Sequence, residues 1–124
     1  LKPGGRFGFT MEEGEPLTEA ERARMPDADT VWLLPLPDML ACLEQIGLRV
    51  RRLEECSQPH RAVVDSLVNA FAADASDIVT QVGPRALQDL LTAHRLWSAW
   101  LRDGRVRKFA VIAEKAPAPA ALGS

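Results

Sequence analysis

The sequence predicts one α/β domain with the order strand, helix, strand, helical insert, antiparallel strand. An apolar run at 7–11 and an alternating apolar and basic run from Leu48 are both typical of strands, and helical spacing lies between them. The last run, 109–113, holds consecutive apolar residues, which is typical of a strand buried on both faces, whereas alternation indicates an edge strand. A helix joining the first two strands favours a parallel pair. The buried last strand is therefore expected between them, running antiparallel.

The first strand is predicted over residues 6–12. It follows Lys2-Pro3-Gly4-Gly5, where proline fixes one backbone angle and the glycines allow positive φ, as a turn requires. Residues 13–36 are acidic, contain three prolines and offer only a short helical possibility at 18–25. A connection of this length is uncommon unless it is functional or mobile.

The helix between the first two strands is predicted over 37–46. Proline and aspartate at its start suit a first turn, and the apolar residues Met39, Leu40, Leu43 and Ile46 follow at helical spacing. Gly47 stands where helices commonly end in the left-handed conformation. The second strand is predicted from Leu48 to about Glu54, with one face in the core.

Residues 57–104 are predicted to be a helical insert. An apolar stripe covers 63–71, Ser76-Asp77 would cap a short helix, Gly83-Pro84 would break it, and a long helix would run from there to Gly104. The last strand is predicted over 106–114. Residues 116–124 show no periodicity and are predicted to be a disordered or extended tail.

Composition narrows the class of protein. The chain has 124 residues, 47% apolar and 26% charged, which is typical of a globular domain. Its 15 basic residues are scattered and its net charge is −2, which argues against a nucleic-acid partner. No apolar run approaches the roughly 20 residues of a membrane span, and no signal peptide is visible, so we expect a cytoplasmic protein.

Two cysteines, Cys42 and Cys56, lack any spacing typical of zinc ligands, so we expect reduced, buried structural thiols and no metal site. The chain begins at Leu1 instead of Met. We therefore expect it to be a cut or truncated form of a longer protein.

Three segments resemble class I S-adenosylmethionine-dependent methyltransferases of the small-molecule type. Leu1 to Arg6 resembles the turn before their fifth strand, and 37–50 resembles the following helix and sixth strand. The closing segment, from Trp97 through Gly104 to Lys115, is similar to their final strand. The resemblance implies that 1–115 is the C-terminal part of a Rossmann-like methyltransferase sheet, with 57–104 as a helical cap. The other interpretation is a different α/β fold with a similar carboxyl end.

The resemblance does not extend to the cofactor site. The family's glycine-rich loop after the first strand, and its acidic residue at the end of the second, have no counterpart here. Gly4-Gly5 precedes a strand instead of following one, so it cannot place a helix N-terminus against a ligand. S-adenosylmethionine is therefore expected to be bound by a missing N-terminal half, and this chain alone should be inactive.

Methyl transfer requires mainly alignment and exclusion of water, because the sulfonium supplies the electrophile. Catalytic residues therefore stay unassigned. In open α/β sheets ligands lie outside the carboxyl ends of strands, which here are Thr10, Met11, Glu12 and Glu13. Glu12 or Glu13 would orient a hydroxyl or a cationic amine, or accept a proton from it. The alternative is a solvated acidic loop.

Four further residues are candidates for binding the methyl acceptor. His60 opens the helical insert, while His94 and Trp97 lie in its last helix, where a general base or an aromatic wall is one interpretation and ordinary core is the other. Trp32, in the long connection, is either part of a lid or a hydrophobic anchor of the loop. The basic run 105–108 is interpreted as solvated strand ends, with phosphate or carboxylate recognition as the alternative.

The expected partners are a small-molecule methyl acceptor and a second copy of the chain. Without the first half of the sheet, the strand at 7–11 would keep one open edge, which favours pairing into a homodimer, with domain swapping as one route. A non-catalytic interaction module that retains half of the fold is the alternative function.

Overall fold

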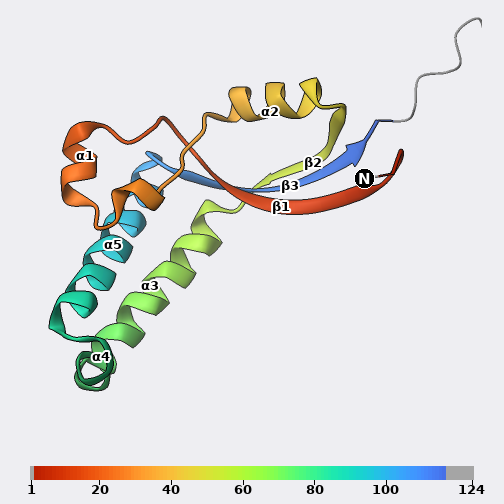
Figure 1. Ribbon diagram of the computed structural model, residues 1–124. Coiled ribbons are helices and arrows are strands. Elements are labelled where there is room, and N and C mark those ends of the chain that lie inside the picture. Colours follow the sequence, from red (N-terminus) through yellow and green to blue (C-terminus); the bar gives the residue numbers. More distant parts are fainter. Residues whose placement is uncertain (1, 117–124) are drawn as a thin grey trace, which may run out of the picture.

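Three strands form one sheet in the order β1-β3-β2: β1 is Arg6–Glu13, β2 is Leu48–Glu55 and β3 is Arg107–Lys115. This computed structural model describes residues 2–116, so the predicted tail lies, apart from Ala116, outside the described residues. β3 runs antiparallel to both neighbours (Figure 1). The predicted central, reversed last strand is confirmed, and its bounds differ from the prediction by one residue.

Helix α2, Leu36–Gln45, covers one face of the sheet (Figure 1). Its Met39 and Leu43 are buried in one cluster with Phe109 and Val111 of β3. The expectation that β3 is buried on both faces is wrong, because Ile112, on the opposite face, keeps 39% of its surface exposed. The run of apolar residues therefore marks a central strand, but in the described chain helical cover reaches only one side of it.

The helical insert consists of α3, Ser57–Ala73, α4, Ala75–Val82, and α5, Pro84–Asp103. α3 and α5 lie side by side and lead away from the sheet, and α4 lies at their far end. Gly104 ends α5 with a φ of 76°, as predicted. The predicted cap at Ser76-Asp77 is wrong: the helix begins at Ala75, directly after α3, without a side-chain cap.

The connection between β1 and α2 is folded rather than extended. It contains helix α1, Glu19–Arg24, and a short 3-10 helix, η1, Ala28–Thr30. Thr18 and Glu21 form a capping box: the Glu21 N–H donates to Thr18 Oγ1 at 3.2 Å, and the Thr18 N–H donates to Glu21 Oε1 at 2.9 Å. This reciprocal pattern satisfies free N–H groups of a first helical turn and makes so short a helix possible.

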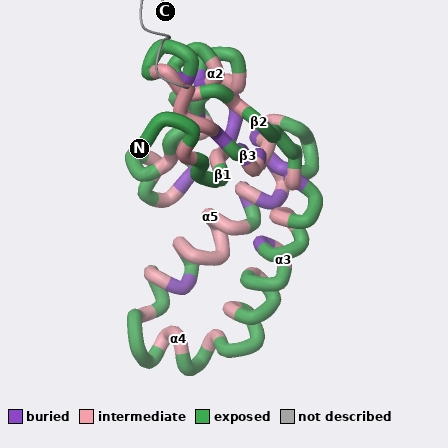
Figure 2. Tube along the Cα trace, turned by 90° about the vertical axis from the view of Figure 1, so that its right-hand side faces the viewer, coloured by how far each residue is buried: buried purple, intermediate pink, exposed green. Residues whose placement is uncertain are grey.

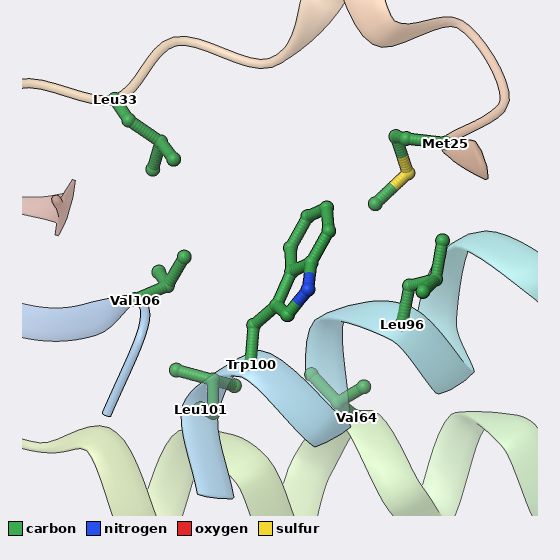
Figure 3. Packing of buried hydrophobic residues seen from close by; sticks show 7 residues of the cluster. All are labelled: Met25, Leu33, Val64, Leu96, Trp100, Leu101 and Val106. Atoms are coloured by element: carbon green, nitrogen blue, oxygen red, sulfur yellow. The ribbon is translucent and has the colours of Figure 1, made fainter. Parts of the chain in front are cut away.

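A second hydrophobic cluster joins this connection to the helical insert (Figure 3). Trp100 of α5 lies at its centre, between the connection above it and α3 below it. The buried members are Met25, Leu33, Val64, Leu96, Trp100, Leu101 and Val106. Buried residues gather where the helices meet the sheet, whereas the outer parts of α3 and α4 are largely exposed (Figure 2).

Both cysteines are free, but Cys42 is exposed and Cys56 half-buried, so the expectation of buried thiols is wrong. Within residues 2–116, no three His, Cys, Asp or Glu side chains gather in a way that could hold a metal ion. The helices in that range are all too short or too polar to cross a membrane.

Candidate functional site

A pocket of about 410 Å³ lies between the carboxyl end of β1, the connection and the inner faces of α3 and α5. β1 contributes one residue to its lining, and the connection, α3 and α5 contribute the others. The lining residues are Glu12, Met25, Pro26, Thr30, Val31, Trp32, His60, Val63, Val64, Leu67, Ala93, His94 and Trp97. A hollow of this size and mainly apolar character is typical of a site for a small molecule.

The structure brings five of the residues singled out in the sequence together in this pocket: Glu12, Trp32, His60, His94 and Trp97. They come from four separate segments of the chain. Their convergence supports a common site. Their roles toward a ligand stay predictions.

Met11 and Glu13 do not line the pocket. Met11 packs with Phe109 and Val111 on the face of the sheet that α2 covers. The buried Glu13 carboxylate accepts hydrogen bonds from the Leu36 N–H at 3.0 Å and from Arg107 Nε at 2.8 Å. Met11 therefore contributes to the core, and Glu13 fixes the start of α2 to the end of β1.

Glu12 lies opposite Lys108 in the register between β1 and β3. Lys108 Nζ is 2.5 Å from Glu12 Oε1, with the lysine side chain 13% exposed and the glutamate 33%. The basic run at 105–108 thus meets carboxylates instead of water alone: Arg105 pairs with Glu21, and Arg107 with Glu13. In the pocket, this pairing offsets the negative charge of Glu12.

His60 is positioned by hydrogen bonds between the start of α3 and β3. The Cys56 N–H donates to the Lys108 carbonyl oxygen at 2.8 Å, and the Lys108 N–H donates to Ser57 Oγ at 3.0 Å. These two bonds hold the first turn of α3 beside the Glu12–Lys108 pair. Burial, and then the nearby Lys108 ammonium, lower the pKa of His60, while Glu12 acts in the opposite direction. His60 is therefore a neutral imidazole near pH 7.

His94 is held deeper in the helical insert, one helical turn before Trp97. Its Nδ1 lies 2.8 Å from the carbonyl oxygen of Leu90, and its ring meets Phe71 edge-on with centroids 5.3 Å apart. A carbonyl oxygen only accepts, so Nδ1 carries the proton in this contact. In the neutral ring, Nε2 is then left as an acceptor.

The two pocket tryptophans differ in burial. Trp97 packs edge-on against Trp100, with centroids 5.8 Å apart, and borders the second hydrophobic cluster. Trp32 is 85% exposed at the rim of the pocket, and its neighbour Leu33 enters the core instead. The interpretation of Trp32 as a hydrophobic anchor of the loop is therefore wrong. Its exposed indole at a pocket rim is consistent with the lid interpretation.

One wall of the pocket was not visible in the sequence pattern: Met25, Pro26, Thr30 and Val31, which lie around η1. The Thr18-x-x-Glu21 capping box would have indicated helix α1 just before them. No comparable signal exists for the path after α1, because Asp27 turns the chain with a φ of 51°, which few residues other than glycine adopt. Val63, Val64 and Leu67 belong to the predicted stripe of α3, and their position in a pocket depends on where α5 lies.

No protein-family model matches the sequence, and no curated protein is found to match it. Solved structures do match the fold. The cyclopropane synthase MmaA2 from Mycobacterium tuberculosis superposes with a TM-score of 0.79 at 13% identity, covering 93% of this chain and 46% of that one. Haemonchus contortus phosphoethanolamine N-methyltransferase 2, in complex with phosphomonomethylethanolamine and S-adenosylhomocysteine, gives 0.75 at 16%, covering 95% and 28%.

The [4+2]-cyclase SpnF gives a TM-score of 0.67 at 23% identity, covering 95% of this chain and 41% of that chain. The chain therefore spans less than half the length of the structures that it matches. A likeness at these identities establishes the fold alone. One of the matched structures is a cyclase, and one fold can support several reactions.

Proposed function

We propose that this chain, which has the fold of the C-terminal part of a Rossmann-like methyltransferase domain, is the acceptor-binding and cap portion of an S-adenosylmethionine-dependent methyltransferase acting on a small molecule. One observation carries the proposal. The pocket lies at the carboxyl end of β1, directly under the helical insert, where open α/β sheets bind their ligands.

The residues of this chain do not fit S-adenosylmethionine itself. Within residues 2–116, no glycine-rich turn leads from a strand directly into a helix. Gly14 follows β1, but a Cβ there would lie 2.9 Å from the Arg105 carbonyl oxygen, so this glycine serves close packing of the connection. The N-terminal turn of α1 is capped by its own Thr18. We therefore assign the cofactor to a preceding N-terminal part of the protein and derive no step through it.

What this chain would contribute is the shape and polarity of the acceptor site. Met25, Val63 and Leu67 provide apolar contact, Trp97 provides an aromatic wall, and Trp32 stands at the rim. Such a site holds an acceptor in one orientation and keeps water away from it. Alignment of this kind is a large part of what methyl transfer requires of a protein.

Two measurements test this function. Calorimetric titration of the 124-residue chain with S-adenosylhomocysteine should give no heat of binding, and tight binding would contradict the assignment of the cofactor to another part. The longer protein that carries this chain should transfer labelled methyl groups from S-adenosylmethionine to a small molecule. Trp97→Ala should reduce that transfer, with Val82→Ala, on the exposed end of α4, as the control.

The second candidate is a non-catalytic interaction module. It is favoured by the outer edge of β1, which has no strand beside it in the described chain. A module would bind a protein through that edge and would tolerate Trp97→Ala in the pocket. Loss of partner binding on changes to β1, with no effect of Trp97→Ala on any activity, would support this candidate over the enzyme.

A further inference from the structure

The pocket contains few charged groups, and those it contains are paired. Glu12 is its only carboxylate in the described lining, and Lys108 Nζ lies 2.5 Å from it. The remaining polar groups of the lining that could meet a ligand are the Thr30 hydroxyl, the Trp indoles and the two imidazoles. A ligand entering this pocket therefore meets no unpaired charge in the described residues.

The absence of an unpaired charge in the described lining favours an uncharged ligand. Moving an ammonium or a carboxylate group from water into a mainly apolar pocket is costly unless an opposite charge is available there. A cation would have to compete with Lys108 for Glu12, and an anion would have to compete with Glu12 for Lys108. An uncharged molecule faces neither cost.

The position of His60 indicates the polar group that such a molecule would carry. His60 lies at the sheet end of the pocket, where α3 is hydrogen-bonded to β3, while His94, Leu67 and Trp97 lie farther along the helical insert. A neutral imidazole accepts a hydrogen bond at one nitrogen. Nδ1 of His94 donates to the Leu90 carbonyl oxygen, so both neutral imidazoles offer one acceptor nitrogen. His60 is the imidazole at the carboxyl end of β1, where open α/β sheets bind their ligands, and no hydrogen bond within the described residues engages its ring.

We propose that the pocket binds an uncharged, mainly apolar small molecule that carries one hydroxyl, with the hydroxyl donating to His60 and the apolar body lying against Val63, Leu67 and Trp97. This inference rests on the proposed function for the identity of the ligand as the methyl acceptor, and it narrows that acceptor to a hydroxyl compound. Binding itself involves only this chain and can be measured without a methyl donor.

The low pKa of His60 agrees with this arrangement. Burial and the Lys108 ammonium keep the imidazole neutral near pH 7, so that a nitrogen lone pair is available to a hydroxyl group. A protonated imidazole would donate from both nitrogens and would favour an anionic ligand instead.

The test uses four naphthalene probes of nearly equal shape, titrated into the 124-residue chain by calorimetry: 2-naphthol, 2-methoxynaphthalene, 2-naphthoate and 2-naphthylmethylammonium. We expect 2-naphthol to bind about tenfold more tightly than either charged probe. His60→Phe should weaken 2-naphthol about five- to tenfold, the size of one lost hydrogen bond, and should leave 2-methoxynaphthalene, which cannot donate, unchanged. Gln88→Leu, at an exposed position of α5 outside the pocket lining, is the control and should change 2-naphthol binding less than about twofold.

A second pair of variants tests the charge argument directly. Lys108→Met leaves the Glu12 carboxylate unpaired and should reverse the preference toward 2-naphthylmethylammonium. Glu12→Gln combined with Lys108→Met removes both charges and should restore the preference for 2-naphthol. Circular dichroism checks that each variant is folded.

Imidazole nitrogen shifts measured by NMR on the unaltered chain need no variant. They should move for His60, and less for His94, when 2-naphthol is added. Tight binding of either charged probe, or equal losses of 2-naphthol and 2-methoxynaphthalene in His60→Phe, would overturn the inference. If 2-naphthol binds as expected but the longer protein transfers no methyl group, the proposed function fails while the ligand class stands.

Discussion

Arg105 binds the carboxylate of Glu21 with both arms of its guanidinium group, Nε at 2.8 Å from Oε2 and Nη2 at 2.7 Å from Oε1. The two residues are 84 positions apart, one at the turn before β3 and the other in α1. Arg105 also donates to the Pro16 carbonyl oxygen at 3.2 Å. One side chain thereby fastens the connection that forms a wall of the pocket to the turn between α5 and β3.

Arg105→Lys tests how much this bidentate contact contributes to the stability of the fold. Lysine keeps the charge but cannot donate from two fixed positions, so the free energy of unfolding should fall by about 1–2 kcal/mol. Urea denaturation measures the change. Arg85→Lys is the control, because Arg85 is highly exposed and its Nε lies 3.8 Å from Asp89 Oδ2, which is a long distance for an ion pair. This variant should change stability by less than about 0.5 kcal/mol. Equal losses in both variants would contradict the role of Arg105.

Stability should also depend on pH through Glu21. Hydrogen bonding to Arg105 lowers the pKa of Glu21 to about 2 from 4.5, against an opposing effect of burial. A carboxyl group whose pKa is lower in the folded state stabilises the fold above its unfolded pKa, and that stabilisation is lost as the pH falls through the folded pKa. The loss should therefore occur between about pH 5 and pH 2.

The full shift corresponds to roughly 3 kcal/mol, but water and salt screen a pair near the surface, so we expect about 1–2 kcal/mol. Glu21→Gln, compared with the unaltered chain by urea denaturation at several pH values, isolates this contribution. The difference in stability should be largest above pH 5 and should shrink toward pH 2. A difference that stays constant over this range would contradict it.

The sheet could be predicted from the sequence because its signals are local. The consecutive apolar residues of β3 indicated a central strand, and the alternation from Leu48 indicated an edge strand, as observed. The exposure of Ile112 could not be predicted in this way. Consecutive apolar residues predict a strand that is covered on both faces, whereas the described chain covers only one face of β3.

The candidate site was predictable only in part. Ends of strands and faces of helices follow from periodicity, which is why Glu12, His60 and His94 could be named. The path of residues 25–32 depends instead on long-range contacts, such as the Arg105–Glu21 pair and the burial of Leu33 beside an exposed Trp32. Local patterns do not contain such contacts, so the wall around η1 was missed.

Leu101→Ala tests the cluster around Trp100. Leu101 is 2% exposed and belongs to the buried cluster where α5, α3 and the connection meet. Truncation should leave a cavity and lower the free energy of unfolding by about 2–5 kcal/mol. Val82→Ala, at a position that is 56% exposed, should cost less than about 0.5 kcal/mol in the same urea titration. A small loss for Leu101→Ala would show that the insert packs loosely on the sheet.

Gly14→Ala tests the close approach of the connection to the turn before β3. A Cβ at Gly14 would lie 2.9 Å from the Arg105 carbonyl oxygen, so the backbone must move apart, at an expected cost of about 1–3 kcal/mol. Gly8→Ala, within β1, is the control: its Cβ would make ordinary contacts at 3.7 Å, and stability should stay equal or rise slightly. Thermal unfolding followed by circular dichroism compares the two, and an equal effect in both would contradict the steric explanation.

The outer edge of β1 should make this chain a homodimer. In the described chain β3 is the only strand paired with β1, and the outer edge of β1 meets a single bridge, from Glu13 to Leu34, so most of one row of its backbone N–H and C=O groups lacks a neighbouring strand. Two aromatic rings, Phe7 and Phe9, stack on that strand with centroids 5.6 Å apart, and Phe7 is 37% exposed. An open edge beside exposed apolar surface favours pairing with a second chain, whereas a lysine on an edge strand opposes it.

Light scattering at increasing concentration should therefore give a dimer for the unaltered chain and a monomer for Phe7→Lys. Ile46→Lys, an equally drastic change on the exposed end of α2, should leave the dimer intact, and a monomer for the unaltered chain at high concentration would contradict pairing through β1.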